Sequence, residues 1–275
     1  MDQLEFWKMN GSGNDFILID NRDGRIAEES MGRLVEQVCR RRESVGADGV
    51  IFVQNSVTHD FSWRFFNADG GEAEMCGNGG RCVARFAHLN GIAGKEMTFE
   101  TQSGPIWAEV RGRVVTVLMP QPSEIDLDID LPAGEGWKSA DFVNTGVPHV
   151  VLRVEDLVHC PVVELGRMIR NHALFAPNGT NADFIRVTGP DSLEIRTYER
   201  GVEDETLACG TGAMAAALVS ARRGLVASPA RVKTRSGEEI LIHFEKKEEE
   251  GTFSRVRLEG STSIVYRARL DPEAL

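Results

Sequence analysis

Short segments with a strand-like pattern dominate the chain. Six segments combine apolar and polar residues in partly alternating order, as half-buried β-strands do. They are residues 63–66, 113–119, 149–154, 193–198, 239–244 and 263–270. Apolar residues recur at helical spacing in 31–38 and 83–87, and the alanine-rich stretch 213–221 favours a helix. The pattern therefore predicts an α+β protein in which strands outnumber helices.

A stretch rich in proline and acidic residues interrupts these patterns near the middle of the chain. Pro120 and Pro122 are followed by the acidic stretch 124–130 and by Pro132-Ala133-Gly134. Proline and glycine favour turns, and acidic residues favour solvent. We therefore predict a connection between two packed units here, with the boundary near residue 120.

The two halves of the chain share short motifs at a constant spacing. Three pairs are 133 residues apart: MCGNG (75–79) and ACGTG (208–212), TQSG (101–104) and TRSG (234–237), and the acidic residues Glu72 and Glu205. A long unit that occurs twice indicates a duplicated domain, because solenoid repeats are much shorter and more numerous. We expect two pseudo-symmetric domains that face each other across a cleft.

Two of these motifs place a cysteine beside glycines at the start of a predicted helix. The unpaired N–H groups and the positive dipole end of such a helix favour a thiolate, and glycine lets the backbone approach a ligand closely. A turn of this kind can bind a carboxylate. If pseudo-symmetry brings Cys76 and Cys209 to one ligand carbon, one thiolate can remove a proton while the opposite thiol delivers another. This layout suits a two-base racemase.

Other kinds of site fit the residues less well. The turns lack the lysine of a phosphate loop and the glycine spacing of a dinucleotide site. Cys76 and Cys82 are not spaced like the usual zinc pair, so we expect no metal. Cys39, Cys82 and Cys160 are expected to be inert core residues. A non-catalytic amino acid binding protein, or a redox switch with a disulfide between Cys76 and Cys209, is an alternative.

The composition of the chain limits the classes of partner that we expect it to bind. The chain has 275 residues, with 31 Lys and Arg against 42 Asp and Glu, and a formal net charge of −11. This charge repels nucleic acid phosphates and anionic lipids, so we expect neither a nucleic acid nor a membrane partner. No apolar run approaches the roughly 20 residues that cross a bilayer, and the first residues lack a secretory signal pattern. We expect a cytoplasmic protein whose five cysteines are reduced.

Four segments are similar to the diaminopimelate epimerase family. They are GSGNDF (11–16), FNADGGEAEMCGNGGRC (66–82), TNADF (180–184) and YERGVEDETLACGTGA (198–213). The resemblance spans both halves and implies two similar domains, each a mixed sheet around a central helix, with the active site in the cleft between them. It implies an N-terminal domain at 1–120, to which a C-terminal strand at 263–275 returns, and a C-terminal domain at 121–262.

The resemblance also implies a reaction. Members of this family interconvert LL-diaminopimelate and meso-diaminopimelate in lysine biosynthesis, without pyridoxal phosphate, a metal or any other cofactor. The family further implies a homodimer, with Tyr266 as an interface residue. A related enzyme that acts on proline or hydroxyproline would share the two thiols, but would not need a polar pocket for a second amino acid group. Such a racemase or dehydratase is the alternative within the fold.

Carried over residue by residue, the resemblance implies a set of site residues. Cys76 and Cys209 become the two acid/base residues, and His149 and Glu199 are further catalytic residues beside the reacting centre. The substrate-binding set is Asn14, Asn67, Gly77, Asn78, Asn181, Glu199, Arg200, Gly210 and Thr211.

Two positions depart from the family pattern. Gly49 in GADG stands where some members have a glutamine that contacts substrate, and Val147 in NTGVPH stands where many have an asparagine. Neither glycine nor valine offers a side-chain hydrogen bond. We therefore expect changed contacts at the distal end of the substrate and an unchanged reaction type.

Overall fold

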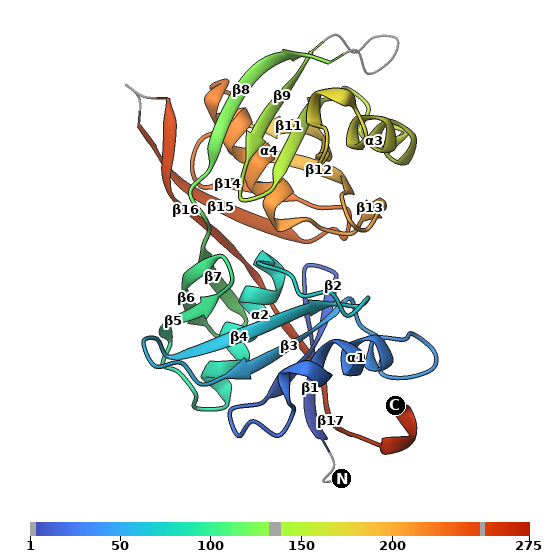
Figure 1. Cartoon of the computed structure of the whole chain (residues 1–275). Helices are drawn as coiled ribbons and strands as arrows, with labels where there is room; N and C mark the ends of the chain where they lie inside the picture. Colours follow the sequence, from blue (N-terminus) through green and yellow to red (C-terminus); the bar gives the residue numbers. More distant parts are fainter. Residues whose placement is uncertain (1–3, 132–138, 248–250) are drawn as a thin grey trace. The chain divides into compact units, whose positions relative to one another are not determined.

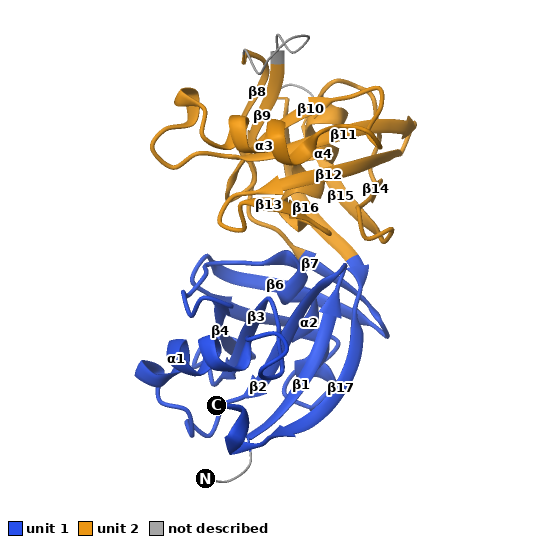
Figure 2. Ribbon diagram, turned by 90° about the vertical axis from the view of Figure 1, so that its right-hand side faces the viewer, with its two compact units in different colours: residues 1–117, 260–275 blue, residues 118–259 orange. Residues whose placement is uncertain are grey.

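Two compact units make up the α+β fold (Figure 1). The structure is a computed structural model that describes residues 4–131, 139–247 and 251–275. Unit 1 comprises Met1–Val117 and Gly260–Leu275, and unit 2 comprises Leu118–Glu259 (Figure 2). The C-terminal segment of the chain therefore belongs to unit 1.

Unit 1 is a mixed sheet with two α-helices. Its elements are β1 (Leu4–Gly11), β2 (Asn14–Asp20), α1 (Glu28–Val38), β3 (Gly49–Gln54), β4 (Phe61–Asn67), α2 (Gly77–Leu89), β5 (Glu96–Thr101), β6 (Gly104–Arg111), β7 (Val114–Leu118), β17 (Ser263–Leu270) and the short η2 (Pro272–Ala274). β1 pairs antiparallel with β2 and β17, and β3 pairs antiparallel with β4. β5, β6 and β7 are successively antiparallel. The parallel pairs β2–β3 and β4–β5 are joined through α1 and α2, as parallel strands require a crossover.

Unit 2 has a comparable set of elements. They are β8 (Ser123–Asp130), β9 (Ser139–Asn144), β10 (Pro148–Arg153), α3 (Val162–Arg170), η1 (Ala173–Phe175), β11 (Asn181–Gly189), β12 (Ser192–Glu199), β13 (Asp204–Thr206), α4 (Gly210–Arg222), β14 (Ala230–Lys233), β15 (Glu239–Lys247) and β16 (Thr252–Ser261). β9–β10 and β11–β12 are antiparallel pairs, and β14, β15 and β16 are successively antiparallel. The parallel pairs are β10–β11 and β12–β14, joined through α3 and α4.

The order of strand pairings is therefore the same in both units. β8 follows the first repeated set of strands, β1–β7, but pairs with β9 in unit 2. β17 follows the second copy of this set, β9–β16, but pairs with β1 in unit 1. Each copy thus supplies the other unit with one strand. Motifs that repeat in the sequence correspond to a repeated topology.

α2 and α4 are the central helices of the two units. Ten of the 13 residues of α2 and eleven of the 13 residues of α4 are buried, so both helices are enclosed on all sides. α4 is rich in alanine, which favours the helix and lets neighbouring elements approach closely. α1 buries only Met31, Val35 and Val38, as a helix that covers one face of a sheet does.

Most elements predicted from the sequence are confirmed. The six strand segments overlap β4, β7, β10, β12, β15 and β17, and the three helical stretches lie in α1, α2 and α4. Neither α3 nor the remaining strands were predicted.

The acidic stretch 124–130 is a strand of unit 2, so it is not part of the connection between two units that the sequence predicts. It belongs to β8, in which Ile125, Leu127 and Ile129 are half-buried and the acidic residues between them are exposed. Ile129 packs against the core of unit 2. The alternation of apolar and acidic residues is a strand pattern that the high acidic content obscured. The predicted turn Pro132-Ala133-Gly134 lies outside the described residues.

The acidic residues that match between the two halves form equivalent ion pairs. Glu72 accepts two hydrogen bonds from the guanidinium of Arg64 in β4, one of them at 2.7 Å. Glu205 accepts two from Arg196 in β12, at 2.7 and 2.8 Å. Two parallel bonds of this kind hold a turn in a defined orientation. The constant spacing of these two glutamates therefore reflects an arginine–glutamate ion pair that occurs in both units.

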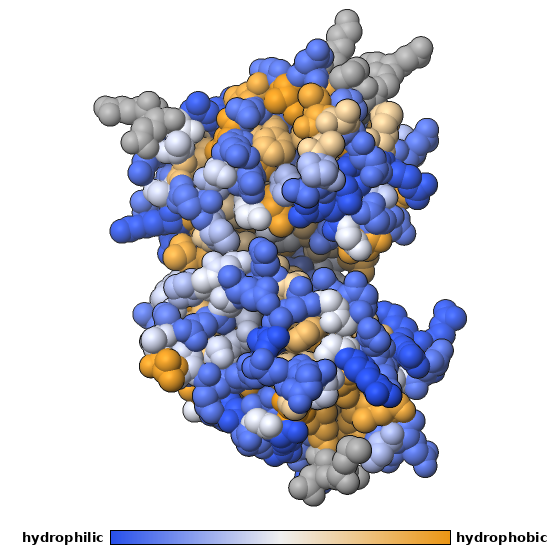
Figure 3. Space-filling view, in the orientation of Figure 1, coloured by the Kyte–Doolittle hydropathy of each residue, from blue (hydrophilic) through white to orange (hydrophobic). Residues whose placement is uncertain are grey.

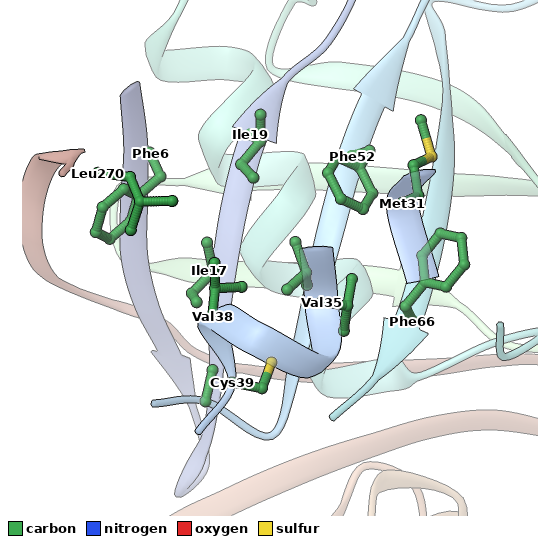
Figure 4. Close-up of a cluster of buried hydrophobic side chains, with 12 residues drawn as sticks. Phe6, Ile17, Ile19, Met31, Val35, Val38, Cys39, Phe52, Phe66 and Leu270 are labelled. Carbon is green, nitrogen blue, oxygen red and sulfur yellow. The ribbon is translucent and has the colours of Figure 1, made fainter. Parts of the chain in front are cut away.

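α1 packs its buried stripe against the strands of unit 1 (Figure 4). Met31, Val35 and Val38 belong to one cluster with residues of β2 and β3, including Ile17 and Phe52. Cys39, which directly follows the helix, is part of the same cluster and has a free thiol.

Burial of Cys39 predicts a loss of stability at alkaline pH. Desolvation raises the pKa of this thiol to about 12, above the value of about 8.5 for an unfolded chain. Between these values the native state holds a proton that the unfolded state has lost, so the contribution is complete below about pH 8.5 and falls as pH rises. The expected slope is at most about 1.4 kcal/mol per pH unit. Urea unfolding from pH 8.5 to 10.5 measures it, and Cys39→Ala is expected to give a shallower decline; equal slopes would contradict the assignment.

Candidate active site

In unit 1, the predicted site residues lie at one end of neighbouring strands. Asn14 begins β2, Gly49 begins the parallel strand β3, and Asn67 ends β4. Gly49 is in register with Phe16 of β2 and lies opposite Asn67. Because β4 runs antiparallel to β3, its last residue meets the first residue of β3. The topology thus brings together residues that are distant in the sequence.

Cys76 caps the N-terminus of α2. Its backbone is extended, with φ −143° and ψ 116°, and its Sγ accepts a hydrogen bond from the N–H of Gly79 at 3.4 Å. The thiol in turn donates to Oδ1 of Asn14 at 3.7 Å. A Cβ on Gly79 would lie 3.2 Å from Cδ1 of Ile51, so glycine lets this first turn pack closely against β3. Gly77 and Asn78 are buried in the same turn.

The equivalent residues of unit 2 lie at the corresponding strand ends. Pro148 begins β10, Asn181 begins β11, and Glu199 ends β12. Cys209 caps α4 with φ −117° and ψ 116°, and its Sγ accepts from the N–H of Gly212 at 3.4 Å. Both cysteines therefore have the same backbone conformation and the same bond to the third residue of the helix.

The Cys209 thiol is not in an environment that favours the thiolate. Burial raises its pKa well above the usual value, and the carboxylates of Glu199 and Asp183 raise it further. Thr211, whose Oγ1 lies 3.3 Å from Sγ, and the N–H of Gly212 act in the opposite direction and are outweighed. Desolvation therefore opposes the thiolate that a helix N-terminus favours.

A buried polar network includes His149, one of the residues predicted to be catalytic. Its Nδ1 lies 2.7 Å from Oδ2 of Asp183, and neither side chain is exposed. Oδ1 of Asp183 accepts from Oγ1 of Thr197 at 2.7 Å. The Nδ2 of Asn181 lies 3.4 Å from Nε2 of His149. Since an amide nitrogen only donates, Nε2 is the acceptor of this contact and Nδ1 faces Asp183.

The side-chain amide of Asn181 forms its hydrogen bonds within unit 2. Its side chain donates to the carbonyl of Pro148 at 3.1 Å and accepts from the backbone N–H of Arg200 at 2.7 Å. It is 3% exposed. This geometry holds His149 and Arg200 in place. Arg200 itself is half-buried, and its Nη1 reaches the carbonyl of Asn178 at 3.3 Å.

The remaining predicted residues differ in exposure. Asn67 is exposed, Asn14 and Glu199 are half-buried, and Gly210 and Thr211 form the first turn of α4. Sequence reasoning missed Asp48 and Asp183, which bond to Asn14 and His149. Asp48 lies in the motif GADG, and Asp183 lies in TNADF. Their place as acidic residues inside these motifs was the signal that could have identified them.

The two departures from the family pattern have structural correlates. A Cβ on Gly49 would lie 2.5 Å from the carbonyl oxygen of Phe66 and 2.8 Å from the ring of Phe65, so this conformation has no room for a side chain. Near Val147, the Oδ1 of Asn144 accepts from the N–H of Gly146 at 3.0 Å. That asparagine is therefore engaged in its own turn.

Gly49→Ala is expected to destabilise unit 1, because the added methyl group would overlap backbone atoms that cannot move away easily. Overpacking of this kind costs about 1–3 kcal/mol. Urea unfolding measures the loss. Gly94→Ala is the matched control, since a Cβ there would meet the carbonyl oxygen of Glu96 at an ordinary 3.4 Å and should change stability by less than about 0.5 kcal/mol. Equal stabilities of the two variants would refute the close packing.

Neither metal clusters nor membrane-spanning helices occur in the described part of the chain. No group of three or more His, Cys, Asp or Glu side chains that could hold a metal ion is found there. None of the helices in the same ranges is both long and apolar enough to span a membrane. The face drawn in Figure 3 is mostly hydrophilic, with hydrophobic residues in separate patches.

Solved structures with little sequence identity share the fold. A phenazine biosynthesis protein of the PhzF family from Bacillus anthracis has a TM-score of 0.73 and 16% identity, with 98% of this chain and 100% of that chain covered. A probable proline racemase from Agrobacterium radiobacter K84 has a TM-score of 0.70 and 15% identity, with 98% of this chain and 95% of that chain covered. At this identity the likeness concerns the fold alone.

Sequence comparison is more specific. The family model for diaminopimelate epimerase matches residues 6–124 and 142–258. The diaminopimelate epimerase of Aquifex aeolicus is 47% identical over 99% of both chains. That of Chlorobaculum tepidum is 46% identical over 95% of this chain and 99% of its own length. The paired cysteine turns, the repeated topology and this identity over nearly the whole length agree, and the chain belongs to the diaminopimelate epimerase family.

Proposed function

We propose that this protein is a cofactor-independent epimerase that interconverts LL-diaminopimelate and meso-diaminopimelate. The observation that carries the proposal is the pair of equivalent helix N-termini, each capped by a cysteine with the same hydrogen bond to its third residue. The names and identities of its relatives support the small-molecule substrate. Lysine biosynthesis is the process that such a product serves.

In the proposed mechanism, the two units are the duplicated domains, and Cys76 and Cys209 act on opposite faces of one substrate carbon. One sulfur removes the α-proton as a thiolate, and the other delivers a proton from its thiol to the opposite face. The N–H groups of the turns at Gly77-Asn78 and Gly210-Thr211 bind the reacting carboxylate and stabilise the charge that develops beside it. The resting thiol needs a nearby base or a change of environment to ionise, because burial disfavours the Cys209 thiolate.

The polar residues at the strand ends would hold the rest of the substrate. Asn14 and Asn67 supply amides, and Arg200 supplies a guanidinium that suits the second carboxylate. Within unit 2, the bonds of Asn181 to the backbone of Arg200 and toward His149 support a positioning role for Asn181. A proline or hydroxyproline racemase of the same fold is disfavoured by the 47% identity to a diaminopimelate epimerase and by these additional polar groups.

We further propose a cytoplasmic homodimer. Exposed apolar side chains on β17 support a contact there, since Val265 is 56% and Tyr266 is 41% exposed. Sedimentation analysis of wild type and Tyr266→Glu tests this arrangement, and a monomeric wild type would exclude it.

Incubation with LL-diaminopimelate in deuterated water tests the proposed reaction. We expect deuterium at the α-carbon of the meso product and the same rate after exhaustive treatment with a chelator. A non-catalytic binding protein would leave the α-proton unexchanged. Absence of both exchange and product from well-folded protein would overturn the proposal.

A further inference from the structure

A chain of polar side chains in unit 1 leads from one arginine to another through the residue that contacts Cys76. Arg81 donates to Oδ1 of Asn78 at 3.0 Å, and Nδ2 of Asn78 donates to Oδ1 of Asn14 at 3.5 Å. Nδ2 of Asn14 donates to Oδ2 of Asp48 at 2.6 Å. Arg41 donates to Oδ1 of the same carboxylate at 2.8 Å. Every donor in the first three links points toward Asp48.

The two ends of this chain determine which way the amide of Asn14 faces. The carboxylate of Asp48 has no proton to give, so only the Nδ2 side of Asn14 can face it. On the other side, Arg81 donates a hydrogen bond to the side-chain oxygen of Asn78, so the side-chain nitrogen of Asn78 faces Asn14. Oδ1 of Asn14 is therefore directed at the sulfur of Cys76, where it accepts from the thiol at 3.7 Å. A reversed amide would bring two donors together at Asn78.

Asp48 is itself held in place. Its Oδ2 also accepts from the backbone N–H of Asp15 at 3.1 Å, and its own N–H donates to Oδ1 of Asp15 at 3.1 Å. Arg41 bonds to both carboxylates, and Lys8 lies 2.8 Å from Asp15. Asp48 is the single member of this group that bonds to the side chain of Asn14.

We propose that Asp48 is a positioning residue for the epimerase reaction, which fixes the amide of Asn14 so that an acceptor faces Cys76 and holds it as a thiol ready to donate a proton. This inference rests on the proposed function. Asp48 does not touch the sulfur and acts through Asn14. Asp48 also pairs with Arg41, and Arg81 bonds to Asn78, so a test must separate orientation from charge.

Two substitutions separate these effects. Asp48→Asn removes the charge but keeps an oxygen that can accept from Nδ2 of Asn14. Asp48→Ala removes both, so the amide of Asn14 can turn and present a donor to the sulfur, which favours the thiolate. Asp20→Ala is the matched control, because Asp20 in β2 forms a similar half-exposed pair with Arg22 and has no bond to Asn14.

The first measurement needs no substrate. Alkylation of Cys76 by iodoacetamide at pH 7.5, quantified by peptide mass spectrometry, is expected to be about three- to tenfold faster in Asp48→Ala than in Asp48→Asn, as loss of one hydrogen bond to the thiol would produce. Asp20→Ala should alkylate at the wild-type rate. Equal rates in Asp48→Ala and Asp48→Asn would overturn the proposal, because charge alone would then explain any change.

The second measurement is kinetic. With LL-diaminopimelate, Asp48→Ala is expected to lower kcat about tenfold or more, since a misdirected group near the reacting atoms costs turnover. Asp48→Asn should retain most of kcat. If Asp48→Asn and Asp48→Ala lose kcat equally, the orienting role is wrong. An inactive wild type would instead reject the proposed function, while the alkylation rates would still decide the orientation of Asn14.

Discussion

Replacement of Cys76 or Cys209 by serine is expected to lower the rate of epimerisation by about 10²–10⁴-fold, because each sulfur serves one face of the substrate carbon. Serine is a good N-cap residue, so its oxygen can keep the bond that the sulfur accepts from Gly79 or Gly212. Its hydroxyl group does not ionise at working pH. The fold should therefore survive while proton transfer is lost, which circular dichroism and stereospecific product analysis together measure.

The remaining cysteines provide the control. Cys160 is free, lies outside the two turns, and has a pKa raised chiefly by burial. Cys160→Ala should keep kcat/KM within about threefold of wild type, because it touches neither proposed capping turn. Substantial epimerisation by well-folded Cys76→Ser or Cys209→Ser would sink the two-base mechanism.

Arg200→Ala is expected to lower kcat/KM for LL-diaminopimelate by two or more orders of magnitude, more than Asn67→Ala does. A guanidinium can bind a carboxylate through two parallel bonds, and its loss leaves the distal group of the substrate unpaired at about 1–3 kcal/mol per group. Lysine at this position should restore little, because it lacks the planar fork. Wild type should also strongly prefer diaminopimelate over proline, and comparable kcat/KM values for both substrates would contradict the proposed specificity.

Arg170→Ala separates substrate binding from loop structure. Arg170 donates to the carbonyl of Asn178 at 3.3 Å, the same oxygen that Arg200 reaches at 3.3 Å. It also pairs with Glu203 at 2.9 Å. We expect this variant to retain nearly all of its kcat/KM. A loss as large as that of Arg200→Ala would show that both residues act by tethering the loop, and that Arg200 does not bind the substrate.

The sequence alone identified the parts of this protein that depend on local patterns. Alternating residues predicted the strand segments later seen in β4, β7, β10, β12, β15 and β17, and helical spacing predicted α1, α2 and α4. The motifs around Cys76 and Cys209 predicted two equivalent capped helices and the family. Capping, periodicity and turn chemistry are encoded within a few residues, so they could be recognised before any tertiary contact was known.

Only the tertiary structure decided how these parts act on one another. It showed that an acidic stretch pairs as β8, that Asn181 is buried with its amide engaged, and that Gly49 has no space for a side chain. It also showed that burial and two carboxylates raise the pKa of the Cys209 thiol. Each of these depends on desolvation or on contact between segments far apart in the chain. Such effects arise from neighbours in space, and a local pattern of residues does not specify them.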